Sequence, residues 1–139
     1  KALPMPIVEG CLKRLEIIDS EEGDALRKKC WTVTRRIQQG FRELGFDIGP
    51  AQANVTPVHM EAGVNQASNI ALALRQEYKI FCSIVVYPVI PPGMIIFRII
   101  PTAAHSIEDV DYTLNAFRDI KERMEKGEFD KAIPQVRLG

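Results

Sequence analysis

Met94-Ile95-Ile96-Phe97-Arg98-Ile99-Ile100 is an apolar run interrupted by a single charge, and it predicts a buried or half-buried strand. Successive side chains of a strand point to opposite faces, so Arg98 is expected to share its face with Met94, Ile96 and Ile100. A guanidinium among such neighbours is costly unless an anion meets it. The residues alone allow three interpretations: a structural pair with an Asp or Glu, a snorkelling side chain on an edge strand, or a clamp for a carboxylate or phosphate.

Two helices are predicted in the N-terminal part. Pro4 and Pro6 open the first, which continues to Ile18. Asp19 or Ser20 can cap the second helix, and Gly45 supplies its C-terminal stop. The apolar residues on one face of the first helix are Ile7, Cys11, Leu12, Leu15 and Ile18, and those of the second are Leu26, Cys30, Val33, Ile37, Phe41 and Leu44.

The rest of the chain alternates between short strands and helices. Asn54 to Met60 predicts a strand at a sheet edge or a bulge, because Pro57 cannot donate to a ladder. Further predicted segments are a short strand or turn at 46–50, a helix at 65–78, a strand at 80–87 and a rigid proline-rich loop at 88–93. The last helix starts at the capping box Ser106-Ile107-Glu108-Asp109, with Val110, Leu114, Phe117, Ile120 and Met124 on its apolar face.

The predicted order is helix, helix, strand, helix, strand, strand, helix. Short connections and one hairpin-like loop favour an α+β fold, with a small, mostly antiparallel sheet and helices packed on one face. A chain of 139 residues fits one domain with a sizeable core.

Charge and cysteine content exclude several classes of function. Lys+Arg and Asp+Glu each number 18, so the basic footprint of a nucleic-acid binder is absent. The longest apolar stretches are too short to span a bilayer. Cys11, Cys30 and Cys82 make no CxxC or CxxH spacing, so we interpret them as buried thiols of a reducing, cytoplasmic compartment, not as metal ligands. We therefore expect no nucleic-acid partner, no membrane and no metal.

No complete catalytic set is present in the sequence. It contains neither a G-x-G-x-x-G nor a G-x-x-x-x-G-K phosphate loop, and no serine in a G-x-S-x-G elbow. His59 is interpreted as a core or interface residue, and His105 as a hydrogen-bonding group at the turn before the last helix. Glu108, Asp109 and Asp111 suit the dipole of that helix and need no catalytic role.

Several motifs nevertheless resemble one family. The order Pro91-Pro92-Gly93, Arg98 and Ala103-Ala104-His105-Ser106 resembles the C-terminal small domain of the α-oxoamine synthases, which are fold-type-I pyridoxal 5'-phosphate (PLP) enzymes. Ala2-Leu3-Pro4, Phe41-Arg42-Glu43-Leu44-Gly45-Phe46 and Thr56-Pro57-Val58 look like the family's "ALP", "LKELGF" and "VPV" segments. Tyr87-Pro88-Val89-Ile90-Pro91 is closer to glycine C-acetyltransferase (2-amino-3-ketobutyrate CoA ligase) than to 8-amino-7-oxononanoate synthase, whose threonine is valine here.

The resemblance implies a function for Arg98. Enzymes of this family join an amino acid to an acyl-CoA, and the arginine at this position binds the carboxylate of the amino acid. The Schiff-base lysine and the rest of the PLP site belong to a large domain that would precede residue 1. The chain is therefore expected to hold no catalytic or cofactor-binding residue, and to be inactive alone.

The resemblance also implies a domain plan and a homodimeric full-length enzyme. Residues 1–20 are expected to be the end of the large domain and a linking helix, residues 21–124 the small C-terminal domain, and residues 125–139 a charged tail. Two alternatives stay open: the C-terminal domain of a class I/II aminotransferase, whose small domain also offers an arginine to a carboxylate, and a free-standing α+β anion- or ligand-binding module.

Overall fold

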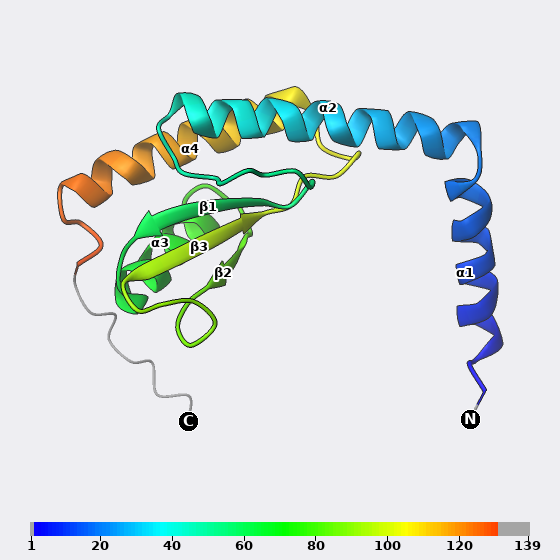
Figure 1. The fold of residues 1–139 in the computed structure, drawn as a ribbon, viewed down its shortest axis with the longest axis horizontal. Coiled ribbons are helices and arrows are strands. Elements are labelled where there is room, and N and C mark those ends of the chain that lie inside the picture. The colour runs from blue at the N-terminus through cyan, green and yellow to red at the C-terminus, as the bar shows by residue number, and fades with distance from the viewer. Residues whose placement is uncertain (1, 131–139) are drawn as a thin grey trace.

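Helices and strands follow each other in the predicted order in the computed structural model, which describes residues 2–130 (Figure 1). The elements are α1 (Met5–Ile18), α2 (Glu21–Glu43), β1 (Thr56–Glu61), α3 (Val64–Gln76), β2 (Ser83–Val85), β3 (Met94–Ile99) and α4 (Ile107–Glu125). The predicted capping of α2 is confirmed, since the Ser20 side chain accepts a hydrogen bond from the Gly23 N–H at 3.2 Å.

The sheet is antiparallel throughout, with the strand order β1-β3-β2. The strand that carries Arg98 is therefore the central one, and this excludes the interpretation of Arg98 as an edge-strand residue. Pro57 lies on the edge strand β1, as predicted from its missing N–H. Outside β1, Asp47 adds a single bridge, because its carbonyl accepts from the His59 N–H at 2.8 Å.

The core lies on one face of this sheet. Ile95, Phe97 and Ile99 of β3 are buried, and their side chains point away from the face of Arg98. Phe97 packs edge-to-face on Phe117 of α4, which contacts Phe41 of α2 in the same way, at ring-centroid distances of 6.1 and 5.0 Å. The predicted α+β class, with a small antiparallel sheet and helices on one face, is confirmed.

Helices α2 and α4 approach each other closely at a glycine. A Cβ atom placed on Gly40 would lie 2.2 Å from Cδ1 of Leu114, so a larger residue there would force the buried Leu114 side chain to move. At the end of α2, Gly45 has a φ of +75°, and the Phe46 N–H donates to the Phe41 carbonyl at 2.9 Å. This is the predicted glycine stop, completed as a Schellman motif.

Two segments differ from the expectation. The predicted strand at 80–87 is shortened to Ser83–Val85, because the Ile80 N–H is used by the Leu74 carbonyl at the end of α3 and Val86 enters a turn with Val89. Residues 126–130, which the sequence assigns to a charged tail, pack on the domain, and Phe129 is 4% exposed within the core. The rest of that predicted tail, 131–139, lies outside the described residues.

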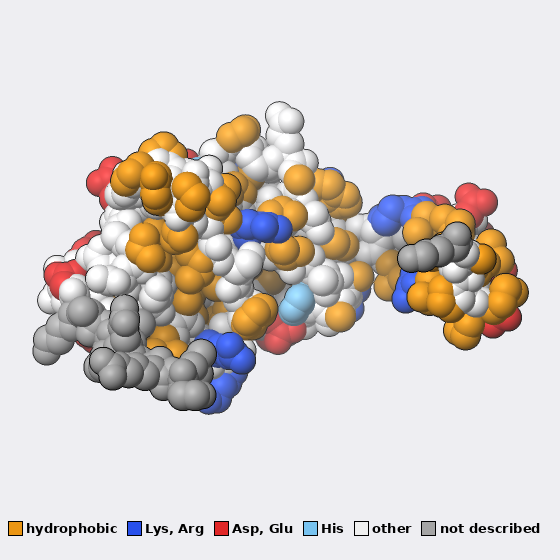
Figure 2. Space-filling model, turned by 90° about the horizontal axis from the view of Figure 1, so that it is seen from below, with side chains coloured by type: hydrophobic (Ala, Val, Ile, Leu, Met, Phe, Trp, Pro, Cys, Tyr) orange, Lys and Arg blue, Asp and Glu red, His pale blue; other side chains and the backbone are white. Residues whose placement is uncertain are grey.

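Helix α1 stands apart from the sheet and from α3 and α4, and it meets the start of α2, where Arg27 donates to the Ile18 carbonyl at 2.8 Å (Figure 1). None of its residues is buried, although it carries the predicted apolar face. Figure 2 shows this helix at the right, with hydrophobic side chains around it. The large apolar residues exposed in or next to α1 are Leu3, Met5, Ile7, Leu12, Leu15 and Ile18. Within residues 2–130, no helix combines the length and the apolar character needed to cross a membrane.

Candidate functional site

Arg98 occupies the middle of the open face of the sheet. Arg98 pairs with Pro57 of β1 on one side and with Ser83 of β2 on the other. The alternation of β3 directs its side chain away from the core, together with Met94, Ile96 and Ile100, as predicted. Backbone pairing on both sides holds the Cα atom of Arg98 in place, so the guanidinium extends from a rigid backbone.

No partner within residues 2–130 neutralises Arg98. Its guanidinium makes no hydrogen bond, ion pair or ring contact with any of these residues, and the side chain is exposed. The interpretation as a structural ion pair therefore has no support in the described part of the chain. An exposed fork of five N–H donors with no protein acceptor can receive a planar anion in two parallel hydrogen bonds.

The surroundings of Arg98 are mainly apolar. Met94 and Ile100, on the same face, are 40% and 45% exposed, and Ile96 between them is half-buried. Figure 2, which views the molecule from the side opposite α2 and α4, shows patches of hydrophobic side chains with isolated basic groups between them. A charged fork in such a setting favours an anion over water most strongly once another surface covers the face and excludes solvent.

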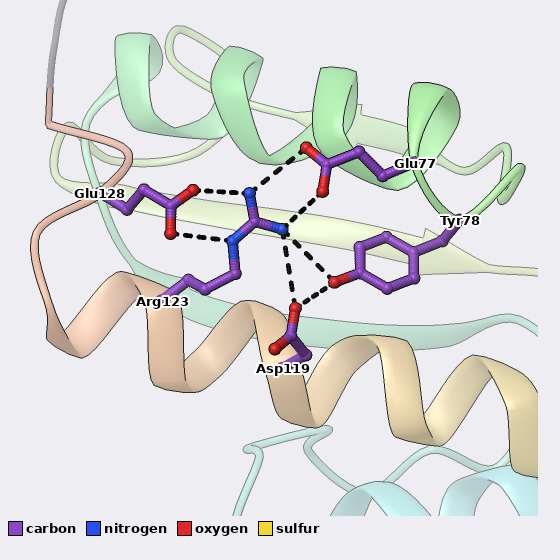
Figure 3. Close-up of polar contacts among 5 residues, drawn as sticks. All are labelled: Glu77, Tyr78, Asp119, Arg123 and Glu128. Atoms are coloured by element: carbon purple, nitrogen blue, oxygen red, sulfur yellow. Dashed lines mark hydrogen bonds and ion pairs between the residues drawn. The ribbon is translucent and has the colours of Figure 1, made fainter.

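Arg123 of α4 gives a direct contrast with Arg98. Its guanidinium bonds to the carboxylates of Glu77 and Glu128 at 2.8 and 2.7 Å and lies 3.6 Å from Asp119 (Figure 3). These hydrogen bonds raise the pKa of Arg123 further above its already high value and lower that of Glu128. Tyr78 donates to Asp119, which raises the pKa of the Tyr78 hydroxyl. Arg123 is thus a structural arginine that joins α3, α4 and the following segment.

The two histidines have different roles. The Nδ1 atom of His105 accepts from the Thr102 N–H at 2.9 Å, which confirms its predicted place in the turn before α4. His59 alternates with the buried residues Val58 and Met60, so its half-buried ring lies on the open face and not in the core. The prediction of a core position for His59 is wrong, because the register of β1 turns it outward; an interface position remains compatible with that face.

The acidic residues at the start of α4 are structural, as predicted. Ser106 and Asp109 form the reciprocal capping box, and the Ser106 backbone N–H lowers the pKa of Asp109. Asp111 pairs with Arg36 of α2 at 2.5 Å. Neither interaction leaves a carboxylate free to act as a base near Arg98.

A pocket of about 450 Å³ lies beside the end of β3, and no motif in the sequence pointed to it. Its lining comes from α2, from the segment after α3, from the end of β3 and from the start of α4, and it does not include Arg98. Burial raises the pKa of its Cys82 to about 11, so this thiol is a poor nucleophile. The pocket therefore adds no evident chemistry to the site at Arg98.

The described lysines lie away from the face that carries Arg98. Lys79 donates to the Gln76 carbonyl at 2.6 Å, Lys121 to the Leu44 carbonyl at 2.8 Å, and Lys13 pairs with Glu16. Lys28, Lys29 and Lys126 are exposed on α2 or at the end of α4. None of them lies on the strands that form the face of Arg98. Among residues 2–130 there is also no group of three His, Cys, Asp or Glu side chains that could hold a metal ion.

Comparison with known proteins identifies the relatives of this fold. A profile of the aminotransferase class I and II family matches residues 5–117. A cysteate-C-fatty acyltransferase of Capnocytophaga ochracea is 50% identical over 127 residues, which are 91% of this chain and 30% of that protein. An 8-amino-7-oxononanoate synthase of Petrotoga mobilis is 36% identical over 99 residues, or 71% of this chain and 25% of that protein.

The same relationship appears among solved structures. The serine palmitoyltransferase of Sphingomonas wittichii superposes with a TM-score of 0.64 at 28% identity, covering 71% of this chain and 25% of that one. The chain therefore belongs to the aminotransferase class I and II family. Its relatives are α-oxoamine synthases, which confirms the predicted resemblance, and it spans 25–30% of their length.

Proposed function

We propose that this chain is the C-terminal small domain of a PLP-dependent acyltransferase that condenses an amino acid with an acyl-CoA, and that Arg98 binds the carboxylate of the amino acid. The observation that carries the proposal is Arg98 itself: an exposed guanidinium on the central strand, without a partner within residues 2–130. An α-carboxylate supplies the planar anion that this fork lacks.

Orientation is the chemical contribution of such a clamp. A carboxylate held by two parallel hydrogen bonds cannot rotate freely, so the bonds at the adjacent carbon take a defined direction. PLP, the cofactor of the relatives, supplies the electron sink when it is bound. The part of the chemistry assigned to this chain is therefore to position the substrate.

The remaining parts of the site are proposed to come from a large domain that precedes this chain. The described lysines are engaged elsewhere or remote from the face of Arg98, which supports a Schiff-base lysine outside it. The bare apolar face of α1 supports the same arrangement, because a helix without buried residues needs a surface to cover it. The isolated chain is then inactive, and the complete enzyme is proposed to be a cytoplasmic homodimer.

The relative with 50% identity favours one more specific candidate. Its name states cysteate and a fatty acyl group as its substrates. We propose cysteate, an amino acid with a sulfonate on its β-carbon, as the first substrate to test, with a long-chain acyl-CoA as donor. An aminotransferase stays the alternative, and it would transfer the amino group without needing acyl-CoA.

The test uses the full-length protein with Arg98→Lys and Arg98→Ala. Loss of a charge-assisted pair in a desolvated site costs about 2–5 kcal/mol, so the amino-acid KM should rise by roughly one to three orders of magnitude for Ala, and less for Lys. The KM for acyl-CoA should stay nearly constant. An unchanged amino-acid KM together with a collapsed melting temperature would contradict the proposal and indicate a structural ion pair.

A further inference from the structure

His59 lies on the same open face of the sheet as Arg98. It pairs with Ile96, which precedes Arg98 by two residues on β3, so the two side chains are diagonal neighbours. Diagonal positions of an antiparallel pair lie about 7–8 Å apart, within reach of long side chains. A small ligand bound at Arg98 can therefore also contact His59.

The His59 ring has no partner within residues 2–130, whereas its backbone is fixed. The His59 N–H donates to the Asp47 carbonyl at 2.8 Å, and the flanking residues Val58 and Met60 are buried. The position of the ring is thus set by the strand, but its nitrogens make no hydrogen bond to these residues. An imidazole keeps at least one N–H donor in either protonation state.

The other residues around His59 on this face do not provide a hydrogen-bond partner for its ring. Pro57, Ile96 and Val85 around it are apolar and half-buried. Glu61 lies two residues further along the same face of β1 and makes no ion pair with His59. On this face the imidazole of His59 and the guanidinium of Arg98 therefore lie at a separation fixed by the register of β1 and β3, and the Ser83 hydroxyl lies on the other side of Arg98.

We infer that His59 is a specificity-determining residue, which selects amino acids that carry a second anionic group beside the α-carboxylate bound by Arg98. The inference rests on the proposed function and refines it. With the α-carboxylate on Arg98, a sulfonate or carboxylate on the β-carbon accepts a hydrogen bond from the His59 ring. The side chain of alanine offers the ring no acceptor, and that of serine offers only an uncharged hydroxyl, so binding of a neutral amino acid gains little from His59.

The experiment compares His59→Ala and His59→Gln in the full-length, PLP-loaded protein with four amino acids: cysteate, aspartate, serine and alanine. The matched control is Ser83→Ala, because Ser83 flanks Arg98 from the opposite strand, on β2, and its side chain is exposed. Steady-state kinetics give KM and kcat, and calorimetric titration with cysteate in the absence of acyl-CoA measures binding apart from turnover. Melting temperatures show that each variant is folded.

The expected result is selective. His59→Ala raises KM for cysteate and aspartate, and the calorimetric Kd for cysteate, by about tenfold or more, because a hydrogen bond to a charged group is lost. The KM values for serine and alanine stay within about twofold, as do all values for Ser83→Ala. His59→Gln restores part of the affinity for cysteate, because the amide also carries an N–H donor.

Three results would overturn the inference. These are a wild-type preference for neutral amino acids, an equal rise of KM for all four amino acids in His59→Ala, and unchanged discrimination in that variant. The proposed function fails separately. It falls if the wild-type protein transfers no acyl group to any amino acid, whereas acyl transfer that depends on Arg98 but not on His59 removes only this inference.

Discussion

Arg123 donates to both carboxylate oxygens of Glu77, at 2.8 and 3.3 Å, and so ties the end of α4 to the end of α3. The same guanidinium also holds Glu128, whereas Arg98 on the open face holds no residue of the described range 2–130. Within the described residues, Arg123 is thus paired with carboxylates and Arg98 is not. Because their environments differ so clearly, the same substitution should have different effects at the two positions.

Arg123→Ala should destabilise this chain by about 2 kcal/mol, since it removes charge-assisted hydrogen bonds from a side chain that is 17% exposed. Arg98→Ala should change the free energy of unfolding by less than about 0.5 kcal/mol, because no hydrogen bond or ion pair within residues 2–130 is lost. Chemical denaturation of both variants measures the difference. Equal destabilisation would show that Arg98 also has a structural partner.

The ion pair between Arg123 and Glu128 should stabilise the folded state only at pH values where the Glu128 carboxyl group is ionised. Hydrogen bonding to Arg123 lowers the pKa of Glu128 below its ordinary value of 4.5. A carboxyl group with a depressed pKa stabilises the folded state above its unfolded-state pKa, and this contribution is lost as the pH falls through the folded-state pKa.

The melting temperatures of the wild type and of Glu128→Gln should therefore differ most near neutral pH. The difference should shrink as the pH is lowered below 4.5, the ordinary value for this carboxyl group. Thermal melts of both proteins over a series of pH values provide the measurement. A difference that grows toward acid pH would reverse the predicted sign.

Two helical glycines offer a matched test of the packing between α2 and α4. A Cβ at Gly40 would lie 2.2 Å from Leu114, so Gly40→Ala should destabilise the chain by about 1–3 kcal/mol through overpacking. A Cβ at Gly10, in the exposed helix α1, meets only Arg14 at 3.8 Å. Gly10→Ala should therefore favour its helix by up to about 1 kcal/mol. Circular dichroism melts would show the opposite signs, and a neutral Gly40→Ala would contradict this account of the contact.

The cysteines should differ in their reaction with iodoacetamide. The prediction of a buried thiol is wrong for Cys11, which is exposed on α1. Burial raises the pKa of Cys82 to about 11 and leaves little thiolate at mildly alkaline pH. Mass spectrometry of this chain after brief alkylation should find Cys11 modified well before Cys82. In the full-length protein, protection of Cys11 is expected if a large domain covers α1. Rapid modification of Cys11 there would argue against that docking.

Local patterns predicted most of the fold, because they depend on neighbours in the sequence. The alternation around Arg98 identified its strand and its face, and the serine and glycine signals identified the ends of α2. Contacts between distant segments could not be predicted in this way. The fit of Leu114 against Gly40 and the hydrogen bonds from buried Gln38 to Ala53 and Thr56 depend on how elements pack. The burial of Phe129 was not predicted, because a single aromatic residue within a charged segment makes no hydrophobic pattern.

The candidate site shows the same limit. The sequence identified Arg98 as an unusual residue but could not decide whether an acidic side chain elsewhere meets it, since that depends on the tertiary arrangement. His59 was interpreted as a core or interface residue, and the sequence could not decide between the two, because Pro57 left the pairing of that segment open. Only the register of β1 against β3 brings these two residues to one face.

Arg98 and Phe97 are consecutive on the central strand and point in opposite directions, one to the open face and the other into the aromatic core. The height and tilt of the guanidinium are therefore coupled to the packing of a ring that no ligand can touch. A change in that packing, such as Phe97→Leu, would shift the strand. The affinity of an anion bound at Arg98 would then change as well. If Arg98 binds a substrate as proposed, a substitution beneath the sheet would change that binding while every residue on the open face stays the same.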